Sequence, residues 1–380
     1  MKCLITGGAG YIGSHVAKEL LAQGHDVVVL DSMIKGRNFA IERNKQYAEK
    51  LGRKFVFENG DLSDKDLLNK IFKRNNFDAV LHFAAFIEVG ESVKRPATYF
   101  YNNVINTLHV LDAMALAGAK KIIFSSSAAV YGNPKETPIT EQCLISPVNP
   151  YGYTKLAMEK MIAHYSKRLG IKWIAFRYFN ASGASKEAIL GEAHFPESHL
   201  IPLAISKLAK GEDAKIFGVD YPTKDGTCVR DYIHVEDLAK AHLLALNLKE
   251  EDYNRAYNLG TGNGFTVKEI IETTARLLKT SPKWVDAGRR AGDSDTLVAS
   301  SDAFQKVSNW KLESSDISTI ISSALKWYKN APDEAQKPQY LPNKDEKMLF
   351  SKIKEELRDN RIISEELKNE IIEKLEGYMK

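Results

Sequence analysis

Hydrophobic and polar positions follow two alternating patterns along the first part of the chain. Short runs rich in β-branched and aromatic residues are separated by longer stretches in which apolar residues recur with helical spacing. The runs are CLIT (3–6), HDVVVLD (25–31), KFVFENGD (54–61), DAVLHFAA (78–85), KKIIFSSS (120–127) and IKWIAFRYFN (171–180). Strands that alternate with helices pack as a parallel sheet covered on both faces. The pattern therefore predicts an α/β fold, with a Rossmann-type doubly wound parallel sheet over residues 1–180.

The pattern changes after Asn180. Residues 181–202 are rich in small and turn-forming residues, which is typical of a crossing between two lobes. Residues 181–330 then mix helices with short strands, and they predict a smaller C-terminal lobe that closes over a ligand. Segments near 231–260 have the pattern of elements that return to the first sheet.

The last part of the chain, residues 331–380, is charged and helix-prone. Two apolar stripes with a spacing of four residues predict two short helices broken near Asp359 and Asn360. The stripes are Leu349, Ile353 and Leu357, then Leu367, Ile371 and Leu375. We favour a helical hairpin docked on its own domain; the alternative is an appendage that binds a partner or forms a dimer.

Composition and charge exclude several classes of protein. A chain of 380 residues that is 44% hydrophobic and 27% charged has an ordinary globular composition, not a disordered or fibrous one. A formal net charge of +4, with basic residues interleaved among acids, argues against nucleic-acid or membrane partners. We expect no signal peptide or membrane anchor, because a strand begins close to Met1 and no apolar run reaches membrane-spanning length. The three cysteines are far apart without a C-x-x-C pair, so we expect a cytoplasmic protein without disulfides or a metal site.

A glycine-rich loop follows the first predicted strand directly. Gly7, Gly10 and Gly13 would let the backbone approach a pyrophosphate at a helix N-terminus, although the same pattern also occurs as a simple strand-to-helix turn. Asp31 ends the next strand, about twenty residues on, where a carboxylate binds the ribose hydroxyls of NAD and repels the 2′-phosphate of NADP. The predicted cofactor is therefore NAD. Asp61 ends another strand, where it either faces the adenine or caps a helix.

The segment YGYTK (151–155) supplies a second candidate site. Tyr151 and Lys155 are four residues apart, so on a helix they share one face, whereas Tyr153 points elsewhere. A tyrosine that acts as a base at neutral pH needs a pKa lowered by about three units, which costs roughly 4 kcal/mol. A nearby ammonium and the positive nicotinamide ring can supply that stabilisation. Such pairs are also common on surface helices, but the preceding strand ends in three serines that could bind a substrate oxygen.

These motifs occur in the order of a known family. The segments TGGAGYIGSH, HFAA, VGES, NNV, FSSSAAVYG, YGYTK, RYFN, DGTCVRDYIHV, YNLGTG and RRAGD resemble the extended short-chain dehydrogenase/reductases, and most closely the UDP-glucose 4-epimerase family. The resemblance covers about residues 1–330. It implies that residues 1–180 bind NAD and that residues 181–330 bind a nucleotide sugar. It also implies a homodimer, and it does not explain the tail.

The resemblance assigns roles to individual residues. It implies that Tyr151 is the acid and base, that Lys155 lowers its pKa, and that Ser127 binds the sugar O4. The cofactor site it implies is Gly7, Gly10, Tyr11, Ile12, Gly13, Asp31, Asp61, Leu62, Phe83, Ala84, Ala85, Asn102, Ser125, Tyr151, Lys155 and Tyr178. The substrate site it implies is Ser127, Tyr151, Asn180, His199, Leu200, Arg230, Arg290 and Asp293, in which the two arginines clamp the diphosphate and Asp293 holds the uridine ribose.

The implied reaction interconverts UDP-galactose and UDP-glucose. The 4-hydroxyl proton passes to Tyr151 while hydride leaves C4, and the resulting 4-ketose turns over in the pocket and is reduced on its other face. The reaction is redox-neutral, so NAD stays bound through the cycle.

Three positions depart from the family pattern. Ile87 stands where many members have a lysine that contacts the NAD diphosphate. Leu297 stands where members have either a bulky tyrosine or a small residue, so an N-acetylated sugar is neither implied nor excluded. His199 stands where many members have asparagine near the uracil, and it could equally be an ordinary loop histidine.

Three other activities are compatible with a nucleotide-binding fold of this kind. A nucleotide-sugar 4,6-dehydratase needs an acid and a base near C6, and Ala128 and Ala129 cannot move protons, so we reject it. An epimerase that acts on UDP-N-acetylhexosamines, UDP-pentoses or UDP-uronates stays open. A non-catalytic NAD-sensing protein is less favoured, because such proteins can lose the tyrosine, the lysine or the arginines, which this chain retains.

Overall fold

The computed structural model describes residues 1–290, 293–338 and 343–379. Its centre is a seven-stranded parallel sheet in the order β10-β6-β5-β4-β1-β2-β3. The strands are β1 (Lys2–Thr6), β2 (Asp26–Asp31), β3 (Phe55–Asn59), β4 (Ala79–His82), β5 (Lys121–Ser127), β6 (Lys172–Tyr178) and β10 (Arg255–Leu259). The doubly wound α/β fold is confirmed, and the six predicted strands and one returning segment make up this sheet.

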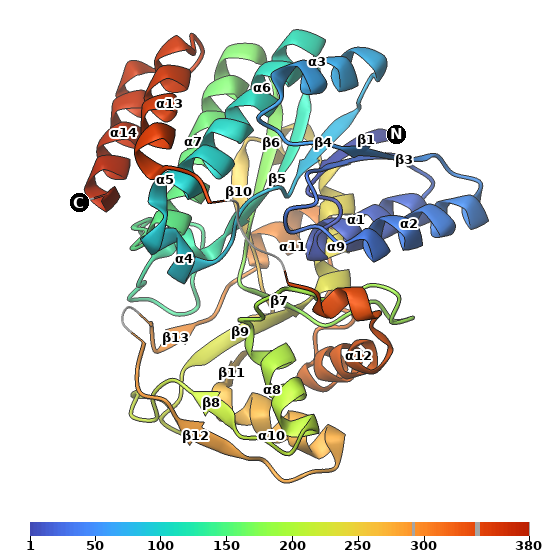
Figure 1. Cartoon of the computed structure of the whole chain (residues 1–380), viewed down its shortest axis with the longest axis vertical. Coiled ribbons are helices and arrows are strands. Elements are labelled where there is room, and N and C mark those ends of the chain that lie inside the picture. The colour runs from blue at the N-terminus through green and yellow to red at the C-terminus, as the bar shows by residue number, and fades with distance from the viewer. Residues whose placement is uncertain (291–292, 339–342, 380) are drawn as a thin grey trace.

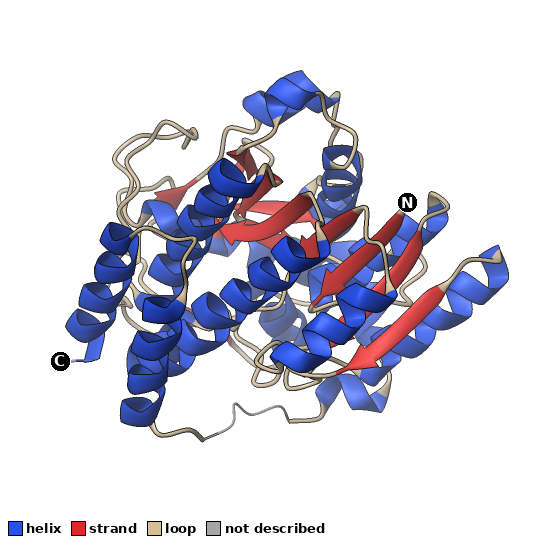
Figure 2. Ribbon diagram, turned by 90° about the horizontal axis from the view of Figure 1, so that it is seen from above, coloured by secondary structure: helices blue, strands red, loops and turns tan. Residues whose placement is uncertain are grey.

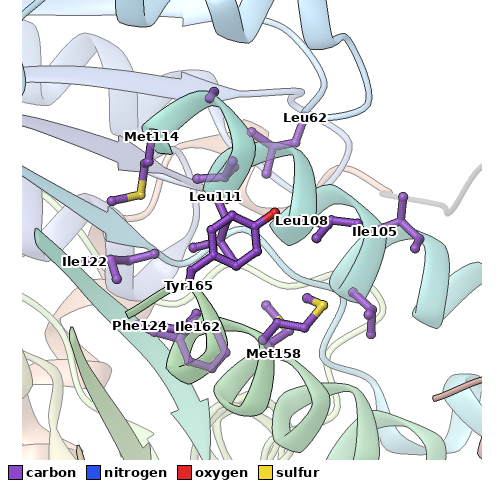
Figure 3. Packing of buried hydrophobic residues seen from close by; sticks show 14 of the residues in the cluster. Leu62, Ile105, Leu108, Leu111, Met114, Ile122, Phe124, Met158, Ile162 and Tyr165 are labelled. Carbon is purple, nitrogen blue, oxygen red and sulfur yellow. The ribbon is translucent and has the colours of Figure 1, made fainter. Parts of the chain in front are cut away.

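Helices cover both faces of the sheet (Figures 1 and 2). One face carries α1 (Tyr11–Ala22), α2 (Asn38–Leu51) and α9 (Val235–Ala245), and the other carries α3 (Lys65–Arg74), α6 (Asn106–Ala117) and α7 (Pro150–Leu169). Strand β2 shows why both faces are apolar: Val28 and Leu30 join one core, and Val27 and Val29 join the other. Figure 3 shows the core between the sheet and α6 and α7.

A second, smaller lobe lies below the sheet in Figure 1. Its main sheet contains β11-β9-β13, with β7 beside β9, and a two-stranded sheet pairs β12 with β8. The strands are β7 (Asn180–Ser182), β8 (Ala214–Ile216), β9 (Val229–His234), β11 (Gly264–Thr266), β12 (Trp284–Asp286) and β13 (Thr296–Leu297). The helices are α8 (Leu200–Ala209), α10 (Val267–Leu278) and α12 (Ile317–Asn330), while α11 (Asp302–Ser308) packs near β10.

Short helical segments join these elements. Between β4 and α6 the chain forms α4 (Val89–Lys94), α5 (Pro96–Tyr99) and a π-helix, η1 (Phe100–Ile105). Three 3-10 turns follow later in the chain: η2 (Ala128–Tyr131), η3 (Glu250–Asp252) and η4 (Asp333–Gln336). Among the described helices, none is long and apolar enough to cross a membrane. Cys3, Cys143 and Cys228 are free thiols.

The tail forms two helices, α13 (Glu346–Asp359) and α14 (Glu365–Met379), which pack beside α5, η1 and α7 (Figures 1 and 2). All six predicted stripe residues are buried in the core on that side of the sheet. Burial of these side chains contributes roughly 10 kcal/mol or more of transfer free energy before the entropy cost of ordering. The hairpin is docked on its own chain, as the favoured interpretation predicts.

Candidate active site

A cavity of 510 Å³ opens at the carboxyl ends of the parallel strands and extends to the second lobe. Ligands of open α/β sheets bind at this edge, because several strand-to-helix loops meet there. The cavity wall includes Gly7 after β1, Asp31 at the end of β2, Phe83 after β4 and Ser127 at the end of β5. Every predicted site residue except Arg290 and Asp293 is among the described lining residues.

The loop between β1 and α1 requires its glycines. Gly7 has a φ of +74°, and a Cβ there would lie 2.6 Å from the nitrogen of Ala84. A Cβ at Gly13 would lie 2.4 Å from the carbonyl oxygen of Gly7. Helix α1 begins after Gly10 without a side-chain cap, so the first N–H groups of the helix are left for a ligand at the cavity. This geometry suits a bound pyrophosphate.

Two carboxylates line the cavity beyond the glycine loop. Asp31 accepts hydrogen bonds from the backbone nitrogens of Ala9 and Met33, both at 2.9 Å. Burial nevertheless raises the pKa of Asp31, which these N–H groups oppose. Asp61 accepts from Ser63 N at 2.8 Å, and the side chain that caps α3 is Asp64. The alternative interpretation of Asp61 as a helix cap is therefore wrong.

Tyr151, Lys155 and Ser127 converge in the middle of the cavity. Lys155 is 1% exposed, and its Nζ donates to Ser125 O at 2.7 Å and lies 5.9 Å from the ring centre of Tyr151. Burial raises the pKa of Tyr151 to about 12, although a hydrogen bond with Ser127 lowers it. Burial also lowers the pKa of Lys155 to about 7, against the effect of Glu159. The protein groups alone therefore do not make Tyr151 a base near neutral pH, and a further positive charge is needed.

Helix α7 is held in place by polar contacts at its start. The side chain of Asn149 accepts from Gly152 N at 2.9 Å and caps the helix, and Pro150 occupies its first turn. Asn103 in η1 donates to Phe86 O at 3.1 Å and to Thr154 Oγ1 at 3.0 Å. These contacts fix the direction in which Tyr151 enters the cavity. Asn103 belongs to the segment NNV, but its sequence pattern does not indicate this role.

A buried ion pair joins α7 to β6. Glu159, four residues after Lys155, accepts hydrogen bonds from Arg177 Nη2 at 2.7 Å and from Arg177 Nε at 3.0 Å. Arg177 also donates to the hydroxyl of Tyr131 at 2.9 Å, and the hydroxyl of Ser126 bonds to Glu159. Sequence reasoning missed this pair, although Glu159 lies one helical turn beyond Lys155 and Arg177 begins the segment RYFN.

Several predicted substrate and cofactor residues reach the cavity from the second lobe and the end of β6. The hydroxyl of Tyr178 donates to His242 Nε2 at 2.6 Å, since His242 Nδ1 already donates to Leu238 O. Asn180 Nδ2 donates to Asp231 O at 2.8 Å. Arg230 also lines the cavity, and its Nη1 donates a hydrogen bond to Val229 O at 2.9 Å.

Arg290 and Asp293 lie on the rim of the second lobe. Asp293 Oδ1 is 3.9 Å from Arg230 Nη2, and the Arg290 guanidinium lies 3.5 Å from the ring centre of Phe217. Both residues are exposed, and the cavity wall does not include them. Their predicted contacts with the diphosphate and the uridine ribose therefore stay predictions.

The loop before α8 contains a charged network that the sequence did not reveal. Buried Glu192 pairs with His199 Nδ1 at 2.5 Å and with His194 Nδ1 at 3.0 Å. Burial alone would raise the pKa of Glu192, but the charge of His199 lowers it to about 2, and Glu192 in turn raises the pKa of His199 against the effect of burial. The sequence predicts no metal, yet ligand atoms of Glu192, His194, Glu197 and His199 lie within 4.8 Å of one another. In the structure these groups already pair among themselves.

The positions that depart from the family pattern also face the cavity. Ile87 and Leu297 both line it, as do His199 and the neighbouring Leu200. Next to Ile87, Glu88 accepts a hydrogen bond from Ser198 Oγ at 3.0 Å, which links the sheet domain to the second lobe. Neither Glu88 nor Ser198 was singled out in the sequence.

The sequence and the fold are both similar to those of known proteins. Residues 3–260 match the model of the NAD dependent epimerase/dehydratase family. The chain belongs to this family. It is 44% identical over 334 residues to the UDP-glucose 4-epimerase of Lactobacillus helveticus, a match that covers 87% of this chain and 98% of that protein.

Solved structures give the same relationship. The UDP-glucose 4-epimerase of Bifidobacterium longum, solved in complex with NAD+ and UDP, is 38% identical with a TM-score of 0.81, and the match covers 88% of this chain and 100% of that one. The UDP-Glc/GlcNAc 4-epimerase of Campylobacter jejuni is 40% identical with a TM-score of 0.75, over 87% of this chain and 99% of that one. These relatives are matched over nearly their whole lengths, so part of this chain has no counterpart in them.

Proposed function

We propose that this protein is an NAD-dependent 4-epimerase that interconverts UDP-galactose and UDP-glucose. The observation that carries the proposal is that Tyr151, Lys155 and Ser127 line the same cavity as the glycine loop and the residues of the second lobe. The glycine loop and Asp31 lie at one end of this cavity, and Asn180 and Arg230 lie at the other. The similarity to UDP-glucose 4-epimerases over most of the chain supports the same activity.

The first end of the cavity would hold NAD. The first N–H groups of α1 suit its pyrophosphate, and the carboxylate of Asp31 suits the ribose hydroxyls. Phe83, Ala84 and Ala85 would line the same site, and Ile87 contributes an apolar side chain where many family members have a lysine. When bound, NAD supplies the acceptor and then the donor of the C4 hydride.

Tyr151 takes the proton of the 4-hydroxyl while the C4 hydride leaves, and it returns a proton to O4 when the hydride comes back to the opposite face of C4. Ser127 would hold the same oxygen, because its hydroxyl lines the cavity close enough to Tyr151 to lower the pKa of the phenol. Lys155 is held by Ser125 O close to the ring of Tyr151, where its charge favours the phenolate. With oxidised NAD bound, Tyr151 would face a second positive charge, which would lower its pKa further.

The second end of the cavity would hold the UDP diphosphate. Arg230 can present two parallel N–H groups to phosphate oxygens, and Asn180 and His199 add donors. We keep Arg290 and Asp293 as candidates for the same ligand, because both lie at the rim beside this end. We also infer a cytoplasmic location from the free cysteines. The homodimer implied by family resemblance stays a prediction.

The shape of the sugar pocket decides whether the protein also accepts UDP-sugars other than UDP-hexoses. Leu297 is smaller than tyrosine, and the relative from Campylobacter jejuni is named for both UDP-Glc and UDP-GlcNAc. An N-acetylated substrate is therefore the second candidate. Ala128 and Ala129 line the cavity without a proton donor, which argues against a dehydratase.

The test is to mix purified protein with UDP-galactose, without added NAD, and to follow UDP-glucose by NMR. Substrate deuterated at C4 should keep its label at C4 in the product, because the hydride returns to the atom it left. UDP-N-acetylgalactosamine, a UDP-pentose and a UDP-uronate, run in parallel, measure the width of the pocket. No conversion of any of them, even with added NAD, would contradict the proposal and favour an NAD-sensing role.

A further inference from the structure

The tail covers an apolar face built by α5, η1 and α7 (Figures 1 and 2). Seven of its side chains are buried in one cluster with residues of these elements: Leu349, Ile353, Leu357, Ile363, Leu367, Ile371 and Leu375. The ring of Tyr378 packs near those of Phe100 and Tyr153, with centres 6.3 and 6.4 Å apart. The contact is therefore an extension of the hydrophobic core.

Polar groups match across the same contact. The hydroxyl of Tyr153 donates to Glu370 at 3.0 Å, and Lys160 Nζ pairs with the same carboxylate at 2.6 Å. Asn360, in the turn between the tail helices, donates to the hydroxyl of Tyr165 at 2.7 Å. Since these partners lie along α7, the tail has one defined position on that helix. Tyr153 thus lies on the side of the YGYTK segment that faces the tail, away from the cavity.

Relatives share the fold without this addition. The Bifidobacterium longum structure is matched over 100% of its length but covers 88% of this chain. The family resemblance covers about residues 1–330, so the unmatched part corresponds to the tail. Without the tail, the apolar side chains of α5, η1 and α7 that pack against it would be exposed together, and soluble monomers rarely expose large contiguous apolar patches. Relatives without a tail need another cover for the equivalent face wherever it is similarly apolar.

A second copy of the same face is the natural alternative cover. A helical face that is apolar along its length can pair with itself across a twofold axis, which gives a closed and symmetric interface. Two helices from each copy then form a four-helix arrangement. The tail supplies two helices to the same face from within one chain, and so it has the shape that a partner would have.

We propose that the tail takes the place of a second subunit. It closes the face of α5, η1 and α7 within one chain and keeps the protein monomeric. Release of the tail leaves a surface that pairs with a second copy of this chain. The dimer that family resemblance implies is therefore absent from this face as long as the tail is bound.

The experiment compares three full-length proteins by light scattering coupled to size-exclusion chromatography. The wild type should have the mass of one chain, 42.6 kDa. Ile371→Asp places a charge at a position that is 0% exposed in α14, so it should release the tail and double the mass. Met348→Asp makes the same change at a position that is 53% exposed in α13, and it should stay monomeric.

A peptide of residues 343–379 tests the contact directly. Added to Ile371→Asp, it should occupy the vacated face and return the mass to that of one chain plus one peptide, whereas the same peptide with Ile371→Asp should not. Leu357→Asp, on the other tail helix, repeats the test if the first variant fails to fold. A dimeric wild type would overturn the proposal. A folded variant with a protease-sensitive tail that stays monomeric, or that forms large aggregates in place of a dimer, would also overturn it.

Discussion

Tyr151 and Tyr153 are two positions apart in α7, yet they serve different parts of the molecule. Residues separated by two positions on a helix point in nearly opposite directions. Tyr151 lines the cavity and bonds to Ser127, whereas the hydroxyl of Tyr153 donates to Glu370 in the tail. The pair therefore offers a matched comparison between a proposed acid and base and a structural tyrosine.

The first prediction uses this pair. Tyr151→Phe should lower kcat by about 10² to 10⁴, because the 4-hydroxyl proton loses its acceptor. Binding of UDP and NAD should be nearly unchanged, since the ring remains. Tyr153→Phe should keep kcat close to that of the wild type. Steady-state turnover of UDP-galactose measures both, and near-normal turnover in Tyr151→Phe would refute the assignment.

A second prediction concerns cofactor choice. Asp31→Asn keeps the side-chain shape but removes the negative charge that repels a 2′-phosphate, so the preference for NAD over NADP should fall about tenfold or more. Asp26→Asn is the control, because Asp26 begins the same strand and accepts a bond from Lys54 N, far from the cavity. Dissociation constants of both dinucleotides measure the effect. Unchanged discrimination would show that Asp31 does not face the ribose.

Residue by residue, the sequence predicted the site best where strands end. Gly7, Asp31 and Ser127 all reach the cavity because the carboxyl ends of parallel strands must meet at one edge. The sequence did not predict the pairing of Glu192 with His199, which depends on the path of an irregular loop. It also placed Arg290 in the substrate site, which stays a prediction because the described lining of the cavity does not include this residue.

At the scale of elements, hydrophobic periodicity predicted the six strands within residues 1–180 and both tail helices, but it did not place the short strands of the second lobe and did not reveal η1. A π-helix has nearly the same apolar pattern as an α-helix, so sequence does not separate the two. In η1, Asn102 lines the cavity, while the next residue, Asn103, makes hydrogen bonds to Phe86 and Thr154. π-helical turns are often found at functional sites.

The third prediction tests how α7 is anchored to the sheet. Glu159→Gln leaves Arg177 buried without its counter-charge, so the free energy of unfolding should fall by about 3 to 5 kcal/mol. Glu250→Gln breaks an ion pair with Lys172 on the surface of the same strand and should cost about 0 to 1 kcal/mol. Urea denaturation followed by circular dichroism measures both. If Glu159→Gln lowered the free energy of unfolding by less than Glu250→Gln does, the buried pair would not anchor the helix.

At the scale of the whole molecule, the two lobes are joined around the cavity by a few polar contacts. The hydroxyl of Tyr11 donates to Gly183 O at 2.7 Å, and Lys18 pairs with Glu187 at 2.6 Å. Ser198 and Glu88 add the link beside the cavity. The sequence indicated two lobes from the change in texture after Asn180, but these contacts join residues far apart in the chain, which no local pattern reveals.

The last prediction uses the division of the cavity between its two ends. UDP at a hundred times its dissociation constant should stabilise the protein by about 2.7 kcal/mol, which raises Tm by several degrees. Arg230→Gln should remove most of this shift while the shift caused by NAD remains, because Arg230 lines only the end next to the second lobe. Arg289→Gln, whose side chain pairs with Asp220 on the surface, should keep both shifts. Differential scanning fluorimetry with each ligand measures them. A full UDP shift in Arg230→Gln would move the diphosphate site away from Arg230, and an equal loss of both shifts would show that the two ends do not bind their ligands independently.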